Sequence, residues 1–419
     1  MKATLVIALH LSIVTAALNT CGNHTTATKA KVFPDQTNNH KTNASGIITG
    51  AEQTGQYVPY LKNKRVGMVV NPTSVIGKET VVDSLLKVGI KITKIFGPEH
   101  GFRGDASAGI AVDDAVDAKT GIKAVSLYGK HEKPTAEDLA DLDIVVFDIQ
   151  DVGVRFYTYI NTLQRVMEAC AENNKELLIL DRPNPNGFYI DGPILDPKLT
   201  SGIGMQPIPV VHGLTVAEYA QMLNGEGWLK GKVKCKIKII KVANYNHDMP
   251  YELPVKPSPN LNTQQSIMLY PTLCLFEGTY LNLGRGTLFP FTVLGAPALK
   301  GKYSFSFTPK GIKGMAESPL HKDSLCYGLD LRNYDIANIR KEKALHLQWL
   351  IELYQTYPKK ADFFNHKLSK QMNNIDKLIG VSEFKDQIIA GKSEQEIRAS
   401  WEPGLSRYKT MRKKYLLYP

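Results

Sequence analysis

Short apolar stretches recur through the first half of the chain and alternate with segments of helical periodicity. Each stretch is five to seven residues long and rich in Val, Ile and Leu, a composition typical of strands. The stretches lie at 65–70, 91–96, 143–149, 176–180 and 236–240. Because strands that alternate with helices build βαβ units, the pattern predicts an α/β fold, with a parallel sheet covered by helices on both faces.

Helices are predicted where apolar residues recur at spacings of three and four. The segment 79–88 carries one such stripe, and a longer one begins at Ile160. Capping-box sequences, in which a Ser or Thr is followed three residues later by an acidic residue, mark helix starts at Thr135, Thr215 and Ser393.

The second half of the chain has a different pattern. KPSPN at 256–260 interrupts the alternation, so we place a domain boundary just after it. The first domain is predicted to span 48–262 and a smaller α+β C-terminal domain 263–419. The expected elements of the second domain are strands around 303–308 and 324–331 and helices near 342–357 and 393–400.

The N-terminal segment has the composition of an export signal. After Lys2 an apolar run extends to Leu18, and small and polar residues precede Cys21. This pattern predicts a signal peptide over 1–21 and export across the inner membrane, to the periplasm or to a lipid-anchored place in the cell envelope. Acylation of Cys21 and simple cleavage with release remain alternatives, and 22–47 is expected to be a flexible tether.

Composition excludes few partners. The chain has 51 Lys and Arg against 40 Asp and Glu, a formal charge of +11 that favours anionic partners. No zinc-knuckle spacing or aromatic-interleaved basic motif is present, so nucleic acid is not an expected partner. The four cysteines beyond Cys21 stand beside apolar residues, which predicts buried free thiols or, alternatively, one disulfide.

Polar clusters follow three of the predicted strands. The stretch 91–96 ends in GPEHGFRGD, 143–149 leads into QDVGVRFYTY, and 176–180 runs into DRPNPNG. In an open parallel sheet ligands bind beyond the carboxyl ends of the strands, so we expect these groups to meet at one rim. The residues concerned are Glu99, His100, Arg103, Asp148, Asp151, Arg155, Tyr157, Asp181, Arg182 and Asn184.

This combination of side chains suits sugar chemistry. Glycoside cleavage needs a carboxyl group that delivers a proton to the leaving oxygen, and arginine can clamp a carboxylate on the substrate. Structural roles remain open for several candidates. Asp148 and Asp151 could cap the following helix, Arg155 could be an ion-pair partner, and His100 could orient its loop.

Other reaction classes lack their motifs. A serine hydrolase would carry G-x-S-x-G, but the nearest stretch, 105–109, lacks the first glycine. A dinucleotide site would carry G-x-G-x-x-G after a strand, and the stretch 283–287 is too short for it. The histidines are scattered, so neither a metal nor another cofactor is expected.

Longer blocks of sequence resemble one known family, the exo-β-N-acetylmuramidases of the NamZ type. The blocks run in order from about Arg65 to the end of the chain. They are FGPEHGFRGD (96–105), VFDIQDVGVRFYTY (146–159), LDRPNPNG (180–187), PIPVVHGLTVAE (207–218), PSPN (257–260), LFEGTYLNLGRGT (275–287) and WEPGLSRYKTMRKKYLLY (401–418).

The resemblance implies a Rossmann-like catalytic domain, an auxiliary C-terminal domain that completes a cleft, and release of N-acetylmuramic acid from the non-reducing end of peptidoglycan fragments. It places the general acid at Glu99, with His100 and Arg103 in support. Glu277 and Arg285 would face the cleft from the second domain. The predicted substrate-binding residues are Arg103, Arg155, Tyr157, Arg182, Asn184, Glu277 and Arg285.

Two points stay open at the level of sequence. The second catalytic group could be Asp148, Asp151, Glu277 or the substrate's own acetamido group. The alternative functions are an exo-β-N-acetylglucosaminidase and a non-catalytic peptidoglycan-binding lipoprotein.

Overall fold

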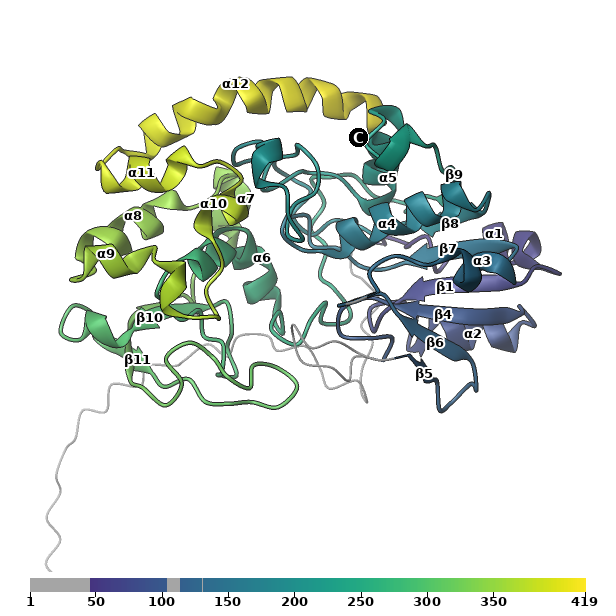
Figure 1. The fold of residues 1–419 in the computed structure, drawn as a ribbon, viewed down its shortest axis with the longest axis horizontal. Coiled ribbons are helices and arrows are strands. Elements are labelled where there is room, and N and C mark those ends of the chain that lie inside the picture. Colours follow the sequence, from purple (N-terminus) through teal and green to yellow (C-terminus); the bar gives the residue numbers. More distant parts are fainter. Residues whose placement is uncertain (1–45, 104–113, 130) are drawn as a thin grey trace, which may run out of the picture.

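A seven-stranded sheet forms the centre of the N-terminal half of the protein (Figure 1). The structure is a computed structural model and describes residues 46–103, 114–129 and 131–419. The strands, in their order across the sheet, are β5 (Ala115–Val116), β6 (Lys123–Ser126), β4 (Ile92–Gly97), β1 (Val66–Val70), β7 (Ile144–Asp148), β8 (Glu176–Leu180) and β9 (Lys236–Ile240).

All neighbouring strands of this sheet are parallel except the short edge pair β5 and β6. Numbered along the chain, the six parallel strands lie in the order 3-2-1-4-5-6, which is the order of doubly wound Rossmann-type sheets. The predicted α/β fold with a parallel sheet is confirmed. From β1 the chain adds strands toward one edge of the sheet, and from β7 it adds them toward the other edge. The topological switch point, where the direction of strand order reverses, therefore lies between β1 and β7.

The central strands are apolar on both sides because helices cover both faces of the sheet. Every residue of β1 and of β7 is buried. Val69 and Val145 join the core on one face, whereas Met68 and Val146 join the core on the other, as the two-residue period of a strand requires. The helices of this half are α1 (Thr54–Leu61), α2 (Val81–Lys87), α3 (Ala136–Ala140), α4 (Tyr159–Glu172) and α5 (Val216–Gly225).

The predicted capping boxes are present. At Thr135, Thr215 and Ser393 the side-chain oxygen accepts the N–H three residues on, and the acidic side chain there accepts the N–H of the cap. A further box at Thr263 opens α6 (Gln264–Leu273) with Ser266 in place of an acidic residue, a variant that the sequence analysis did not include.

The C-terminal half combines a small antiparallel sheet with helices. Its three strands lie in the order β10 (Val293–Ala296), β12 (Cys326–Asp330), β11 (Phe305–Phe307). β11 and β12 fall within the predicted stretches, whereas β10 was not predicted. The further helices are α7 (Ile336–Glu342), α8 (Leu347–Thr356), α9 (Lys360–Phe363), α10 (Ile375–Ile379), α11 (Glu383–Ile389) and α12 (Glu394–Arg412).

The predicted end of the last long helix was wrong. The sequence analysis ended it near residue 400, but α12 continues through Pro403 to Arg412. The reason is its buried stripe, which runs on past the proline through Ile397, Trp401, Leu405 and Tyr408. Figure 1 shows α12 crossing the molecule from the C-terminal helices to α5 of the N-terminal half.

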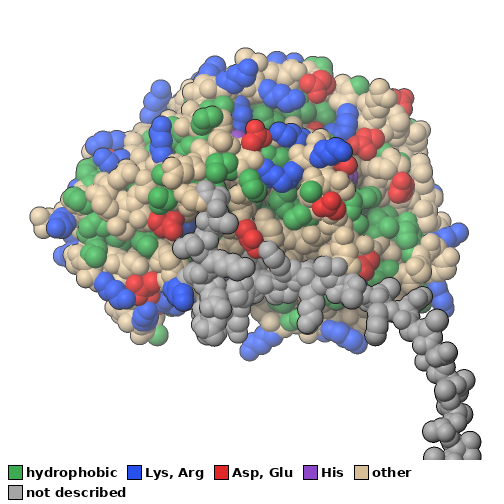
Figure 2. Space-filling view, turned by 180° about the vertical axis from the view of Figure 1, so that it is seen from behind, with side chains coloured by type: hydrophobic (Ala, Val, Ile, Leu, Met, Phe, Trp, Pro, Cys, Tyr) green, Lys and Arg blue, Asp and Glu red, His purple; other side chains and the backbone are tan. Residues whose placement is uncertain are grey.

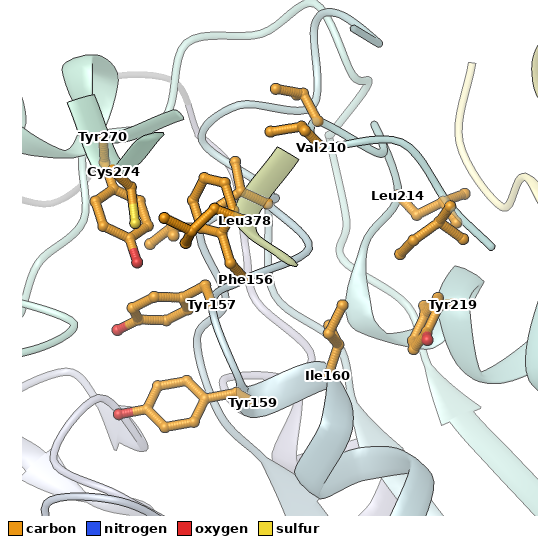
Figure 3. Packing of buried hydrophobic residues seen from close by; sticks show 14 of the residues in the cluster. Phe156, Tyr157, Tyr159, Ile160, Val210, Leu214, Tyr219, Tyr270, Cys274 and Leu378 are labelled. Atoms are coloured by element: carbon orange, nitrogen blue, oxygen red, sulfur yellow. The ribbon is translucent and has the colours of Figure 1, made fainter. Parts of the chain in front are cut away.

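The end of the chain is packed against the N-terminal sheet. The Tyr418 hydroxyl donates to Asp181 at 2.6 Å, directly after β8, and the Leu417 N–H donates to Glu218 at 2.8 Å. One buried cluster also contains residues from both halves, among them Tyr157 and Tyr270 (Figure 3). The two halves therefore share one core and are joined again at the end of the chain.

Charge is spread over the surface. The face in Figure 2 carries basic side chains at many places with acidic ones between them. Within the described residues no helix has both the length and the apolar character needed to cross a bilayer. Cys170, Cys235, Cys274 and Cys326 are buried free thiols. The predicted signal peptide, Cys21 and most of the predicted tether lie outside the described residues.

Candidate active site

A cavity of about 350 Å³ lies where the two halves of the molecule meet. Its lining comes from the loops that follow β4 and β6, from the start of α4, and from α6 and the segment after it. This is the carboxyl-end side of the parallel sheet, where Rossmann-type folds bind ligands. The volume is within the range of small-molecule sites. The cavity is therefore large enough for a single sugar.

Glu99 and His100 reach the cavity from a tight turn after β4. The Gly101 N–H donates to the Pro98 carbonyl at 2.9 Å, and both His100 and Gly101 have positive φ, 73° and 72°. A positive φ is uncommon for a residue with a Cβ and costs on the order of 1–3 kcal/mol, so the surrounding structure must hold His100 in this conformation. The turn leaves Glu99 half-buried and His100 buried at the cavity wall.

Two tyrosines surround the Glu99 carboxyl group. Burial, together with the charge and a hydrogen bond of Glu99, raises the pKa of Tyr128. Burial and the charge of Glu99 likewise raise the pKa of Tyr159. Both side chains are therefore neutral phenols that can donate a proton in a hydrogen bond. Tyr128 was missed by the sequence analysis because β6, which precedes it, is a strand of four residues, of which only the last two are buried, and was not predicted.

Aromatic rings form a second wall of the cavity. Tyr157 contacts Tyr159 edge-to-face at 4.9 Å between centroids, and Tyr270 contacts Phe291 at 5.0 Å. Figure 3 shows Tyr157, Tyr159 and Tyr270 with their hydroxyls on the same side. The Tyr157 hydroxyl donates to the Pro257 carbonyl at 2.8 Å, which fixes this ring against the PSPN segment. Such a wall can pack against the apolar face of a sugar.

Glu277 and Arg285 line the cavity from the C-terminal half. Glu277 lies in the short 3₁₀ helix η3 (Cys274–Gly278), and its Oε1 accepts from Nε and Nη2 of Arg285 at 3.0 and 2.6 Å. Its Oε2 accepts from Nδ2 of Asn373 at 2.8 Å. Burial lowers the pKa of Arg285, but the Glu277 carboxylate outweighs this effect and the net pKa is raised. Both oxygens of Glu277 are therefore held by protein donors.

A second ion pair at the cavity joins Arg165 and Glu132. Arg165 lies on α4, and its Nη2 is 2.7 Å from Oε2 of Glu132 in the loop before α3. Thr158, Thr162 and Arg165 stand at spacings of four and three, so they share one face of the helix. The sequence analysis considered only the apolar stripe of this helix. The polar stripe beside it was a signal that could have identified Arg165.

Asp148 and Arg182 lie away from the cavity. They form a buried ion pair between the ends of β7 and β8, with Arg182 Nε to Asp148 Oδ1 at 2.6 Å and Nη2 to Oδ2 at 2.9 Å. Asp148 is 0% and Arg182 3% exposed. Asp148 and Arg182 bind each other, and neither side chain is accessible. The catalytic role predicted for Asp148 and the substrate-binding role predicted for Arg182 therefore do not fit their positions.

Asp151 and Asn184 are also buried outside the cavity lining. Asp151 accepts the Gly153 N–H at 2.6 Å, so it stabilises a turn, and burial raises its pKa to about 7. Asn184 donates to the Leu214 carbonyl at 2.9 Å and accepts the Asn186 N–H at 2.8 Å. Asp151 therefore stabilises a turn rather than capping the following helix, whose N-cap is Thr158, and Asn184 binds backbone groups rather than facing the cavity.

Two further predicted arginines bind protein groups. Arg103 makes a two-point ion pair with Asp117, at 2.5 and 2.7 Å, beside the cavity wall rather than in it. Arg155 is 1% exposed, and among the described residues its guanidinium donates to backbone carbonyls, including those of Leu378 and Ile379 at the end of α10. Arg155 therefore has neither the substrate contact that was predicted nor the ion pair that was the alternative.

Among the predicted site residues the structure thus brings five together at the cavity. These are Glu99, His100, Tyr157, Glu277 and Arg285. Within the part of the chain that the structure describes, no group of three or more His, Cys, Asp or Glu side chains has a geometry that could hold a metal ion.

Comparison with known proteins assigns the chain to a family. Family models described as the N-terminal and C-terminal parts of the exo-β-N-acetylmuramidase NamZ match residues 66–265 and 268–418. The chain belongs to the NamZ family. The two NamZ segments meet close to the cavity, since Glu99 and Arg165 come from the first and Glu277 and Arg285 from the second. Membership makes the chain a glycoside hydrolase, and the resemblance stated from the sequence blocks is confirmed.

Individual NamZ relatives agree along nearly the whole chain. The peptidoglycan β-N-acetylmuramidase NamZ of Bacillus subtilis (strain 168) is 37% identical over 417 residues, which cover 94% of this chain and 96% of that protein. Crystal structures of two DUF1343 family proteins from Bacteroides fragilis NCTC 9343 are similar in fold. One is 44% identical with a TM-score of 0.81, the other 29% identical with a TM-score of 0.73, and each match covers 89% of this chain and 99% of the other.

Proposed function

We propose that the protein is an exo-acting glycosidase that releases N-acetylmuramic acid from the non-reducing end of peptidoglycan fragments. The observation that carries this proposal is the position of Glu99, a half-buried carboxyl group beside Tyr128 in a cavity sized for one sugar. The name of the Bacillus subtilis relative, a peptidoglycan β-N-acetylmuramidase, supports the same substrate class.

In the proposed reaction Glu99 is the general acid. Its carboxyl group gives a proton to the glycosidic oxygen as the bond from that oxygen to the anomeric carbon breaks, and positive charge develops on the sugar. Tyr128 forms a hydrogen bond with the carboxyl group, Tyr159 lies close enough to feel its charge, and the backbone hydrogen bond from Gly101 to Pro98 closes the turn that carries it. A water molecule then gives one proton back to Glu99, and its oxygen bonds to the anomeric carbon as the hydroxyl of the released sugar.

Glu277 is the proposed second acidic group. Asp148 and Asp151 are buried outside the cavity lining, which leaves Glu277 and the substrate's acetamido oxygen. Both Glu277 oxygens already accept hydrogen bonds, from Arg285 and Asn373. A carboxylate held at both oxygens is a weak nucleophile but a fixed negative charge, so we assign it electrostatic stabilisation of the developing cation and assign the nucleophilic role to the acetamido group.

The deciding experiment is Glu99→Gln, assayed on a disaccharide with N-acetylmuramic acid at its non-reducing end. Loss of the proton donor is expected to lower kcat by about 10²- to 10⁴-fold, while the melting temperature and the binding of free N-acetylmuramic acid stay unchanged. Glu137→Gln, an exposed position at the start of α3, is the matched control. Full activity of the Glu99→Gln protein would remove Glu99 from the mechanism.

The same assay separates the alternative functions. Faster release of N-acetylglucosamine from a matched glycoside would identify an N-acetylglucosaminidase. Retention on peptidoglycan without release of any sugar would identify a binding protein.

We also propose a site of action outside the inner membrane, free or lipid-anchored through Cys21, on the basis of the signal-like sequence at 1–21.

A further inference from the structure

An acidic sugar meets a cavity that already contains three acidic side chains. Glu99, Glu132 and Glu277 line it, and the guanidinium groups of Arg165 and Arg285 pair with Glu132 and Glu277. A guanidinium that exchanges its present partner for a substrate carboxylate can bind it without adding a negative charge that the acidic groups would repel. The question is which of the two arginines can make that exchange.

Arg285 is the less suitable of the two. Its Nε and Nη2 both donate to one oxygen of Glu277, and the other oxygen of Glu277 is held by Asn373. The Glu277 side chain is only 13% exposed, and the guanidinium lies 5.0 Å from the ring centroid of Phe291. Release of Glu277 from Arg285 would leave a carboxylate without its cation in a largely buried place.

Arg165 differs from Arg285 in its partner. The Arg165 side chain, on helix α4, is 21% exposed and that of Arg285 30%. Glu132, however, is 48% exposed on the loop before α3, whereas Glu277 is 13% exposed. An exposed ion pair contributes little free energy, because both charges are well solvated when apart. Glu132 can therefore turn into solvent at small cost and leave the guanidinium free toward the cavity.

We propose that Arg165 is the residue that selects an acidic sugar, by binding the lactyl carboxylate of N-acetylmuramic acid in place of Glu132. Glu132 is then an internal competitor that occupies the guanidinium while the cavity is empty. This inference rests on the proposed muramidase function. The planar guanidinium can pair with a carboxylate through two parallel hydrogen bonds, and N-acetylglucosamine has no group that would make them.

The test compares two disaccharides that differ in one group. One carries the free lactyl carboxylate, and the other carries the corresponding primary amide. Arg165→Gln is expected to lower kcat/KM for the acid by about 10- to 100-fold, mainly through KM, and to change kcat/KM for the amide little. Arg165→Lys should restore part of the preference. Glu132→Gln is expected to lower KM for the acid several-fold, because the competitor is weakened.

Arg65→Gln is the matched control. Arg65 makes a similar exposed pair with Asp143 at 2.7 Å, just before β1 and thus at the opposite end of the sheet. Equal losses of Arg165→Gln on the acid and the amide would overturn the proposal and make Arg165 a structural residue. A rise in KM on Glu132→Gln would also overturn it, since Glu132 would then be a substrate ligand rather than a competitor.

Failure of the proposed muramidase function can be told apart from failure of the Arg165 assignment. If the wild-type protein releases no sugar from either disaccharide, the muramidase function fails. Titration of the wild type and the Arg165→Gln variant with free N-acetylmuramic acid and N-acetylglucosamine then still decides on Arg165. A preference of the wild type for the acid that disappears in the variant supports the assignment, and equal affinities in both proteins contradict it.

Discussion

Arg155 illustrates how one residue type serves different purposes in this protein. Its guanidinium donates to four carbonyl oxygens, those of Pro193, Ile208, Leu378 and Ile379. The last two belong to the final turn of α10, where a helix leaves its carbonyls unpaired and favours a positive charge. Arg155 is thus a contact between the two halves of the molecule.

Removal of this side chain should destabilise the protein. We expect Arg155→Leu to lower the free energy of unfolding by about 3 kcal/mol or more, because several buried carbonyls lose their donors. Urea unfolding measures the change, with the half-exposed Arg332→Leu as the control. A variant of wild-type stability that had lost only affinity for the sugar would instead return Arg155 to the substrate-binding residues.

Asp151 gives a prediction for the dependence of stability on pH. Burial raises its pKa to about 7, so between about pH 4 and pH 7 the folded protein holds a proton that the unfolded chain has lost. Stability from this group is therefore present at low pH and is lost as the pH rises through 7.

Asp151→Asn should remove this dependence. The amide oxygen can still accept the Gly153 N–H, and the variant no longer has a carboxyl group that must ionise. We expect the variant to gain stability relative to wild type as the pH increases from 5 to 8, by roughly 2–3 kcal/mol. Parallel stability curves for the two proteins would show that Asp151 does not titrate in this range.

At the scale of elements, α10 and the short helix η3 together hold Glu277 in position. Asn373, just before α10, contacts the Glu277 side chain, and its N–H donates to the Glu277 carbonyl at 2.8 Å. Gly278 permits the close packing of the two helices, since a Cβ there would lie 2.7 Å from Cα of Ile375.

The Gly278→Ala substitution should therefore push η3 and α10 apart. We expect a loss of stability of about 1–3 kcal/mol from overpacking, and a fall in kcat as Glu277 and Asn373 move apart. Gly55→Ala is the control, because α1 has free space at that position and alanine favours a helix. Unchanged kcat in the Gly278→Ala protein would show that the position of Glu277 is not important for turnover.

The elements also show which features of the site could be predicted. The apolar stretches located the parallel strands, and strand ends located Glu99 at the correct edge of the sheet. Arg103, Arg155 and Arg182 follow strands of the same sheet, yet each side chain turns toward protein partners. The direction of a side chain in a loop depends on tertiary contacts, which one sequence does not contain. Glu132 and Asn373 were missed for the same reason, because their roles arise from partners distant in the chain.

At the scale of the whole molecule, the end of the chain stabilises the sheet domain. The Tyr418 hydroxyl donates to Asp181 and accepts the Val242 N–H at 2.9 Å, so it connects β8 with the segment after β9. Tyr418→Phe is expected to lower the free energy of unfolding by about 1–3 kcal/mol, since both partners lie in buried surroundings. Thermal unfolding checks this, with the partly exposed Tyr303→Phe as control. An equal melting temperature for both variants would contradict the role of Tyr418.

The path of α12 has a consequence for how substrate enters and leaves. A clamshell opening of the two halves about a hinge would have to break the shared core, the arginine contact with α10 and the attachment of the last residues. We therefore expect sugar to enter and leave by movement of side chains at the mouth of the cavity, without separation of the two halves.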